Sequence, residues 1–488
     1  MTTEELIAAR RAEPWREALR KSKKNKERTD IPRVEMNELD AEYRSHTRLE
    51  EVNLGLTKEQ AMQEAQRCLD CPNPTCMQGC PVSINIPTFV KNIERGEFLE
   101  AARVLKETSA LPAVCGRVCP QEKQCESKCI HLKMGKPAVA IGYLERFAAD
   151  YERESGNISI PEVAEKNGIK IAVVGSGPAG LSFAGDMAKR GYDVTVFEAL
   201  HEIGGVLKYG IPEFRLPNKI VDVEIEGLRK MGVKFMTNCI VGKTISYDDL
   251  HADGFKGIFA ASGAGLPNFM NIPGENLVGV MSSNEYLTRV NLMDAANPDS
   301  DTPVLQGKKV AVIGGGNTAM DSVRTARRLG AERAMIIYRR SEEEMPARIE
   351  EVKHAKEEGV EFLTLHNPIE YIADEQGKVK QVILQKMELG EPDASGRRSP
   401  VAIPGATETI DIDLAIVSVG VSPNPIVPSS IPGLEMGRKG TIAVNENMQS
   451  SIPTIYAGGD IVRGGATVIL AMGDGRKAAA SMHEQLSK

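Results

Sequence analysis

The sequence has no long apolar run, no secretion signal and no strong excess of charge of one sign. None of its hydrophobic segments approaches the roughly 18 residues that a membrane-spanning helix needs, and its N-terminus is polar and charged. A net charge of -7 over 488 residues gives no reason to expect nucleic acid as a ligand. We therefore expect a cytoplasmic protein that binds neither membrane nor nucleic acid.

Aromatic residues are also scarce, whereas glycine and cysteine are prominent. There are one Trp, 10 Tyr and 11 Phe against 45 Gly, which favours an α/β protein with many tight turns over an aromatic-rich all-β protein. Eight of the nine cysteines lie between Cys68 and Cys129; the ninth, Cys239, is isolated and is expected in the core. Without a secretion signal, this crowding indicates metal ligation and not disulfides.

The first 45 residues form a charged extension with little apolar character. Leu6, Ala9 and Trp15 are too sparse to define a core helix, and the stretch KSKKNKERTD at 21–30 is predicted to be a solvated tail, with a partner-docking arm as the alternative. From Thr57 the pattern becomes helical, because Thr57 and Gln60 have the spacing of a capping box. A cysteine- and proline-rich region of short helices and loops follows, and residues 151–168 resemble a linker.

A dinucleotide-binding fingerprint follows the first predicted buried strand, residues 169–174. The segment GSGPAG at 175–180 has the pattern G-x-G-x-x-G, in which the glycines allow a tight turn, approach to a pyrophosphate and close helix packing. A second strand, 193–197, is followed by Glu198, at the position where an acid hydrogen-bonds to ribose hydroxyls. The alternative is a glycine-rich turn in a purely structural βαβ unit.

A second copy of this pattern begins at residue 309. The segment GGGNTA at 314–319 again follows a buried strand, but the next strand, 334–338, ends in Arg339 and Arg340 instead of an acid. Two guanidinium groups there would pair with a 2′-phosphate, so this site should prefer NADP over NAD. The alternative for the two arginines is an ordinary basic pair on the surface.

A late segment resembles the flavin motif of the glutathione and thioredoxin reductase family. A short strand ends at Asp460, and a helix rich in small residues opens near Thr467. This resemblance implies FAD at the first site and NADPH at the second, with crossover strands at 257–268 and 414–424. It implies an FAD domain in two parts, 166–285 and 425–488, around an inserted NADPH domain, 286–424. The residues expected to bind FAD are Gly175, Gly177, Pro178, Ala179, Gly180, Glu198, Gly205, Asp460 and Thr467, and those expected to bind NADPH are Gly314, Gly316, Asn317, Thr318, Ala319, Arg339 and Arg340.

The eight clustered cysteines occur as two sets of four. The spacing is Cys68-x2-Cys71-x4-Cys76-x3-Cys80, then Cys115-x3-Cys119-x5-Cys125-x3-Cys129. Two tetrahedral zinc sites are one interpretation. However, each set contains a Cys-Pro, as in ferredoxin-like sites where one cysteine of a run ligates the other cluster. A redox-active flavin in the same chain also needs an acceptor for its electrons. Residues 46–165 are therefore predicted to be a helical domain with two [4Fe–4S] clusters.

Several segments of the sequence resemble those of a known family. The segments 67–87, 111–129 and 140–151, with KYGIPEFRLP at 208–217 and YRRSEEEMPA at 338–347, are similar to the small (β) subunit of NADPH-dependent glutamate synthase. They also resemble the N-terminal half of dihydropyrimidine dehydrogenase and the large subunit of NADH-dependent reduced ferredoxin:NADP oxidoreductase, or sulfide dehydrogenase. The resemblance covers roughly residues 50–488.

The resemblance implies a ligand set for each cluster. The first cluster would be held by Cys68, Cys71, Cys76 and Cys129, and the second by Cys80, Cys119, Cys125 and Glu145. Glu145 aligns with a glutamine ligand of the dihydropyrimidine enzyme; Cys115 is its rival, and a solvated helix residue is the alternative role for Glu145. Glu213 and Arg215, in the loop that the family places near the flavin, are candidates for tuning it.

The resemblance further implies an electron-input subunit that takes electrons from NADPH through FAD and the clusters to a partner. The partner would be the large subunit of glutamate synthase. The second interpretation is the large subunit of the electron-bifurcating ferredoxin:NADP oxidoreductase, whose partner carries flavin and [2Fe–2S]. A zinc-stapled nucleotide-binding scaffold is the non-enzyme alternative. No amidotransferase or synthase domain is recognisable, so the chain alone is not expected to form glutamate from glutamine.

Overall fold

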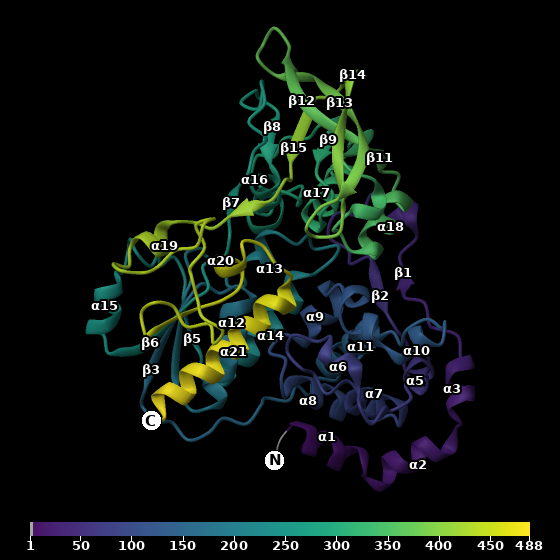
Figure 1. The fold of residues 1–488 in the computed structure, drawn as a ribbon, viewed down its shortest axis with the longest axis vertical. Helices are drawn as coiled ribbons and strands as arrows, with labels where there is room; N and C mark the ends of the chain where they lie inside the picture. The colour runs from purple at the N-terminus through teal and green to yellow at the C-terminus, as the bar shows by residue number, and fades with distance from the viewer. Residues whose placement is uncertain (1–2) are drawn as a thin grey trace.

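The computed structural model describes residues 3–488 and divides them into a helical part and two parallel-sheet domains (Figure 1). The helical part lies at the lower right of the view, the first sheet domain at the lower left and the second at the top. Across residues 3–488, no helix combines the length and apolar character needed to cross a membrane. The predicted fold class, a helical domain followed by two Rossmann-like domains of which one is inserted in the other, is confirmed.

Short helices joined by proline-containing loops form the cysteine-rich part. They are α5 (Lys58–Gln66), α6 (Thr75–Gln78), α7 (Ile86–Glu94), α8 (Phe98–Lys106), α9 (Pro112–Val118), α10 (Ile130–Lys133) and α11 (Ile141–Ser155), with the turns η1 (Gln121–Lys123) and η2 (Glu126–Lys128). The capping box at Thr57 is confirmed, because Thr57 and Gln60 exchange side chain–backbone hydrogen bonds at the start of α5. Helix α9 crosses α11 at Gly116, where a Cβ atom would lie 2.5 Å from the backbone nitrogen of Arg146.

The prediction of a solvated tail at 21–30 is wrong, because this stretch belongs to helices and buries Arg28. The chain forms α1 (Thr3–Arg11), α2 (Pro14–Ser22) and α3 (Asn25–Asp30), which wrap the outside of the helical part and are here called the N-terminal arm (Figure 1). Arg16 and Arg28 are each only 1% exposed, and they bond to Asp70 and Glu94. The arm is attached mainly by long polar side chains, so it has none of the apolar periodicity by which a packed helix is recognised.

The first sheet domain is built on a five-stranded parallel sheet. Its order is β17 (Ile455–Ala457), β6 (Phe255–Ala260), β3 (Lys170–Val174), β4 (Asp193–Phe197) and β5 (Lys234–Met236). Its helices are α12 (Pro178–Lys189), α13 (Val206–Tyr209), α14 (Asn218–Lys230), α15 (Tyr247–Ala252), α19 (Ile426–Ser429), α20 (Asp460–Arg463) and α21 (Val468–Leu486). Strand order reverses at β3, so the crevice for a ligand is expected beyond its carboxyl end.

The second sheet domain repeats this plan. Its parallel sheet has the order β11 (Glu361–Thr364), β10 (Arg333–Tyr338), β9 (Lys309–Ile313), β15 (Leu414–Val417) and β8 (Val280–Ser282). Its helices are α16 (Ser283–Leu287), α17 (Asn317–Arg328) and α18 (Ile349–Glu357), with the turns η3 (Thr288–Leu292) and η4 (Glu342–Glu344), and an antiparallel sheet of β12 (His366–Ala373), β13 (Val379–Pro392) and β14 (Arg398–Asp411) covers one side.

The boundary that we predicted between residues 285 and 286 needs correction. Strand β8 pairs with β15 and so belongs to the second sheet domain, which therefore begins before Val280. The crossover is instead marked by β7 (Leu266–Pro267) and β16 (Val421–Ser422), which pair antiparallel inside the two predicted crossover segments. Three residues of β8 are too short a run to show a strand pattern.

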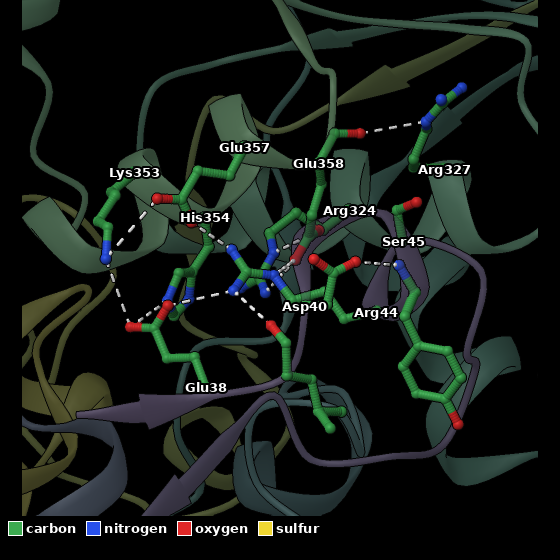
Figure 2. Close-up of polar contacts among 12 residues, drawn as sticks. Glu38, Asp40, Arg44, Ser45, Arg324, Arg327, Lys353, His354, Glu357 and Glu358 are labelled. Carbon is green, nitrogen blue, oxygen red and sulfur yellow. Dashed lines mark hydrogen bonds and ion pairs between the residues drawn. The ribbon is translucent and has the colours of Figure 1, made fainter.

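A buried ion network ties the segment after the arm to the second sheet domain (Figure 2). This segment contains β1 (Asn37–Glu38), α4 (Ala41–Arg44) and β2 (Asn53–Gly55). Arg44, 1% exposed, donates to Glu38, Glu357 and Glu358. Arg324 and Arg328 also pair with Glu358. Although burial disfavours its charged form, the guanidinium groups of Arg324 and Arg328 hold the pKa of Glu358 far below its usual value.

We expect Arg44→Met to destabilise the protein by about 3–5 kcal/mol, because buried carboxylates would lose their shared cation. The measurement is urea unfolding followed by circular dichroism. Lys353→Met is the matched control, since Lys353 contacts the same Glu38 and Glu357 but has a 55% exposed side chain, so its loss should cost less than about 1 kcal/mol. Equal destabilisation by the two variants would contradict the prediction.

Candidate active site and iron–sulfur sites

A cleft of about 1590 Å³ separates the two sheet domains and is lined by both glycine-rich loops. From the first sheet domain it receives the 175–179 loop, Glu198, Gly205 and the 458–471 segment. From the second it receives Gly316, Asn317, Thr318 and Asp321. The structure thus brings both predicted nucleotide loops to one space, although they are about 140 residues apart in the sequence.

The three glycines of the first loop have different surroundings. Gly175 has φ +102°, and a Cβ on it would lie 2.4 Å from the carbonyl oxygen of Ala261. A Cβ on Gly180 would lie 2.1 Å from the carbonyl oxygen of Gly175. Gly177, in contrast, has ordinary backbone angles and no atom within 4 Å of where its Cβ would be. Two glycines are thus required by the fold, whereas Gly177 leaves open space on the side of the cleft.

Glu198, at the carboxyl end of β4, organises the turn around this loop. One carboxylate oxygen accepts hydrogen bonds from the backbone N–H and the hydroxyl of Ser176, at 2.9 and 2.5 Å, and the other accepts from the Leu200 N–H at 2.8 Å. The Ser176 hydroxyl in turn accepts from the Gly204 N–H. A Cβ on Gly205, which has φ +55°, would lie 3.0 Å from Gly177 Cα, so the 204–205 turn packs directly on the loop.

The segment from Asp460 to Thr467 and the start of α21 also line the cleft. Asp460 begins α20, and burial raises its pKa. Thr467 is the N-cap of the 19-residue helix α21, whose first turn faces the cleft. Helix α21 packs closely on α12, because a Cβ on Gly475 would lie 2.4 Å from the carbonyl oxygen of Ala179. The positive end of a long helix dipole therefore lies at the cleft beside Asp460.

The second loop has the same construction. Gly314 has φ +143°, and a Cβ on it would lie 2.3 Å from the carbonyl oxygen of Ser418; Ala319 is fully buried against the sheet. Gly316 is the N-cap of α17 and has only Pro346 within 4 Å of its Cβ position. Asn317 Oδ1 accepts from the Arg348 N–H at 2.8 Å, which fixes the loop to the 346–348 turn, and Thr318 is exposed in the cleft.

The two arginines after β10 have unequal surroundings. Arg340 is buried and binds Asp393 at 2.7 Å and the Arg398 carbonyl oxygen at 2.8 Å, which anchors the loop between β13 and β14. Arg339 is exposed and forms no ion pair with the described residues, 3–488. Of the pair, Arg339 therefore has the guanidinium that is available to a ligand.

The loop predicted to lie near a flavin contributes one residue to the cleft. Arg215 lines the cleft and pairs with Asp321 of α17 at 2.8 Å and with Glu351 of α18 at 3.2 Å. Glu213 points elsewhere: it accepts from the Asn218 N–H at the start of α14 and lines a separate pocket of about 270 Å³. Cys239, expected in the core, is partly exposed and lines the cleft, because strand β5 ends just before it.

Four thiols form a first group around the loop before α6. The members are Cys68, Cys71, Cys76 and Cys129. Burial raises the pKa of Cys76 well above its usual value, and repulsion from the other three members adds to this. Burial also raises the pKa of Cys68 to about 11. All four cysteines are partly exposed, so this group lies near the surface.

The second group lies deeper and contains a carboxyl group. Its thiols are Cys80, Cys115, Cys119 and Cys125, of which the last three are buried. Burial raises the pKa of Glu145 to about 8, and Glu145 acts by repulsion on all four thiols. Its Oε1 is buried and has no hydrogen-bond partner. An unpartnered buried oxygen beside cysteines fits a metal-ligand role for this side chain.

Among residues 3–488, no three thiols lie close enough together to form a ready site for a single metal ion. Tetrahedral zinc with bonds of about 2.3 Å would place its sulfur ligands about 3.8 Å apart. Within residues 3–488, the one set of three donor atoms all within 4.8 Å of one another is Glu38, His354 and Glu357, which contains no cysteine. Arg44 and Lys353 already neutralise that set, so we assign it to the ion network of Figure 2.

Contacts that the sequence did not indicate connect the second thiol group to the cleft. Cys115 Sγ lies 3.5 Å from Met472 Sδ of α21, and Gln124 Nε2 donates to Thr467 Oγ1 at 3.4 Å. A Cβ on Gly473 would lie 3.0 Å from the carbonyl oxygen of Pro81. The loops that carry these thiols therefore pack on the helix whose N-terminus faces the cleft, and no local motif could have shown this.

Comparison with known proteins agrees with this architecture. Residues 44–157 match the family model for dihydropyrimidine dehydrogenase domain II, 4Fe-4S cluster, and residues 169–475 match that for pyridine nucleotide-disulphide oxidoreductase. The chain is 38% identical over 428 residues to the glutamate synthase (NADPH) small chain of Escherichia coli (strain K12), with 86% of this chain and 90% of that one covered. The chain belongs to this family. The predicted family and the class of oxidoreductase with an iron–sulfur domain are thereby confirmed.

Members of the family also occur within longer proteins. The chain is 38% identical over 436 residues to the NADP(+)-dependent formate dehydrogenase subunit beta of Moorella thermoacetica, with 84% of this chain and 60% of that protein covered. Among solved structures, Mycobacterium tuberculosis FprA in complex with NADPH is similar at a TM-score of 0.55 and 21% identity, with 66% of this chain and 85% of that one covered. This likeness supports the two-domain fold.

Proposed function

We propose that the chain is the electron-input subunit of an NADPH-dependent flavin and iron–sulfur oxidoreductase. The observation that carries the proposal is the shared cleft, which both nucleotide loops line. The second thiol group packs against α21, whose N-terminus lines the same cleft. When bound, FAD and NADPH would supply hydride transfer and two [4Fe–4S] clusters would supply one-electron transfer. The protein residues bind and orient these groups and set their surroundings.

The residues around the first loop fit FAD. Open space beside Gly177, together with the free N–H groups at the start of α12, suits a pyrophosphate. Glu198 suits the ribose hydroxyls of the adenosine, and Asp460 suits the ribityl hydroxyls. The N-terminus of α21, capped by Thr467, faces the place left for the flavin ring, where its dipole would stabilise negative charge.

The second loop fits NADPH, and the thiol groups fit two clusters. Gly316 and the start of α17 would hold the pyrophosphate, and Arg339 would pair with the 2′-phosphate. Arg340 would act indirectly by fixing the β13–β14 loop beside it. The deep thiol group, with Glu145, would take electrons from the flavin side, and the group nearer the surface would deliver them to a partner.

The test is anaerobic reduction of the isolated chain. We expect bound flavin, about eight irons per chain, rapid oxidation of NADPH with an artificial dye acceptor, and no glutamate formation from glutamine and 2-oxoglutarate. A protein that binds zinc but no iron, or one that forms glutamate alone, would sink the proposal. Purification of the native complex would then distinguish an amidotransferase partner from a flavin and [2Fe–2S] partner.

Arg339→Gln should weaken discrimination between the two nicotinamide nucleotides. Loss of a charge-assisted pair costs about 1.5–3 kcal/mol, so we expect the KM for NADPH to rise roughly 10- to 100-fold while the KM for NADH changes little. Steady-state dye reduction measures both. Arg333→Gln, at the other end of β10 and paired with Glu361, is the matched control and should leave both KM values unchanged.

A further inference from the structure

The loop that carries two ligands of the first thiol group is held by an unusual number of cations. Asp70 lies between Cys68 and Cys71, is fully buried and has φ +52°. A buried carboxylate in a left-handed backbone conformation is unfavourable unless its surroundings fix it. The side chains that donate hydrogen bonds to Asp70 all come from the N-terminal arm.

Three arginines of the arm converge on Asp70. Arg16 donates from Nη2 to Oδ1 at 2.5 Å and from Nε to both oxygens at 3.1 Å, and its Nη1 donates to Thr88 at 2.8 Å. Arg20 donates to Oδ2 at 2.7 Å. Arg11 donates to the Asp70 carbonyl oxygen at 2.8 Å. The conformation of the ligand loop therefore depends on residues about 50 to 60 positions earlier in the chain.

A second set of contacts holds the other side of the same loop. Lys91, fully buried, donates to the Cys68 carbonyl oxygen at 2.6 Å and to Glu94. Arg28 of the arm donates to the Gln66 carbonyl oxygen at 2.7 Å and to Glu94 at 2.8 Å. Lys91 and Arg28 therefore fix the start of the ligand loop through its backbone carbonyl oxygens.

The two thiol groups thus have different electrostatic surroundings. The network at the first group contains five cations, of which the arm supplies four, and two anions; they are Arg11, Arg16, Arg20, Arg28 and Lys91 with Asp70 and Glu94. At the second group, the neighbouring side chains are two buried carboxyl groups: Glu145, whose Oε1 has no hydrogen-bond partner, and Glu126, which pairs with Arg33 at 2.8 Å. Positive charge in a low-dielectric site stabilises an added electron, and negative charge opposes it.

We propose that the N-terminal arm is a working part of the first iron–sulfur site. Arg11, Arg16 and Arg20 position the 68–71 ligand loop, and the arm's cations raise the reduction potential of the cluster held there above that of the second cluster. Electrons that enter beside the cleft then collect at the group nearer the surface. This inference rests on the proposed function, because it needs both clusters to be present.

The test is an anaerobic potentiometric titration of the full chain, monitored by electron paramagnetic resonance. Iron and sulfide are counted per chain. In the wild type we expect two one-electron steps. Arg16→Met should lower the higher step by at least tenfold in equilibrium constant, which is 59 mV for one electron, and leave the lower step in place. Arg16→Lys, which keeps the charge, should restore most of the shift. Glu145→Gln should instead move the lower step, which identifies it as the second cluster.

A purely structural arm would give a different result. Arg10→Met is the matched control, because Arg10 lies on the same arm but pairs with Glu107 at 2.7 Å and not with the ligand loop; both steps should stay unchanged. If Arg16→Met fails to fold, Arg20→Met is the second variant, since the Arg20 side chain is 20% exposed and Arg16 would still hold Asp70. Unchanged potentials in every folded arginine variant would overturn the inference while leaving the proposed function intact. Absence of both steps in the wild type would instead overturn the proposed function.

Discussion

A Gly177→Ala variant should fold as well as the wild type and yet lose most of its FAD. The backbone at Gly177 has angles that alanine adopts readily, and nothing lies within 4 Å of the new methyl group, so the protein itself has room for it. The methyl group would occupy the space proposed for the pyrophosphate. Overpacking costs about 1–3 kcal/mol, so FAD affinity should fall by roughly 5- to 150-fold. Flavin fluorescence titration of the stripped protein measures this.

Two further glycine variants make the comparison specific. Gly180→Ala should destabilise even the flavin-free protein, because its methyl group would lie 2.1 Å from a backbone oxygen that cannot move easily. Gly316→Ala is the counterpart of Gly177→Ala in the second loop, so it should weaken NADPH binding and leave FAD binding unchanged. Wild-type FAD affinity in Gly177→Ala would show that the pyrophosphate does not approach this residue.

The features that the sequence predicted well are those set by neighbouring residues. Gly175 and Gly314 have positive φ directly after a buried strand, and a Cβ on Gly180 would meet the carbonyl oxygen of Gly175, so these features of the fingerprint are local. The capping box at Thr57 is equally local. Such patterns indicate structure because the physical constraint and the residues that satisfy it are contiguous in the chain.

Features that depend on distant charged side chains were not predictable in this way. From the sequence, Arg16 is indistinguishable from a surface residue, but the structure pairs it with the buried Asp70. The sequence likewise predicted Arg340 to bind a phosphate, but the structure pairs it with Asp393. A charged residue has the same sequence signature whether it is solvated or buried against a partner. The sequence could therefore indicate which residue types form the cofactor sites, but not which arginines are already occupied by the protein itself.

The second thiol group offers the sharpest test of a predicted ligand, because Glu145 and Cys115 compete for one place. We expect Glu145→Ala to lose one cluster, so that the iron content falls from about eight to about four per chain, while flavin content and NADPH oxidation with a dye that accepts directly from flavin are retained. Cys115→Ala should keep close to the wild-type iron content. Iron and sulfide analysis of anaerobically reconstituted protein measures both.

The surroundings of the two side chains explain this expected asymmetry. Glu145 carries a buried oxygen without any partner, a cost that coordination to iron would remove. Cys115 already has a neighbour that accounts for its position, since its sulfur lies 3.5 Å from the sulfur of Met472. A carboxylate is also a harder ligand than a thiolate and should leave this cluster with a potential different from that of an all-cysteine cluster. If Cys115→Ala loses the cluster and Glu145→Ala keeps it, the ligand is the thiol, and Glu145 acts only as a buried neighbouring charge.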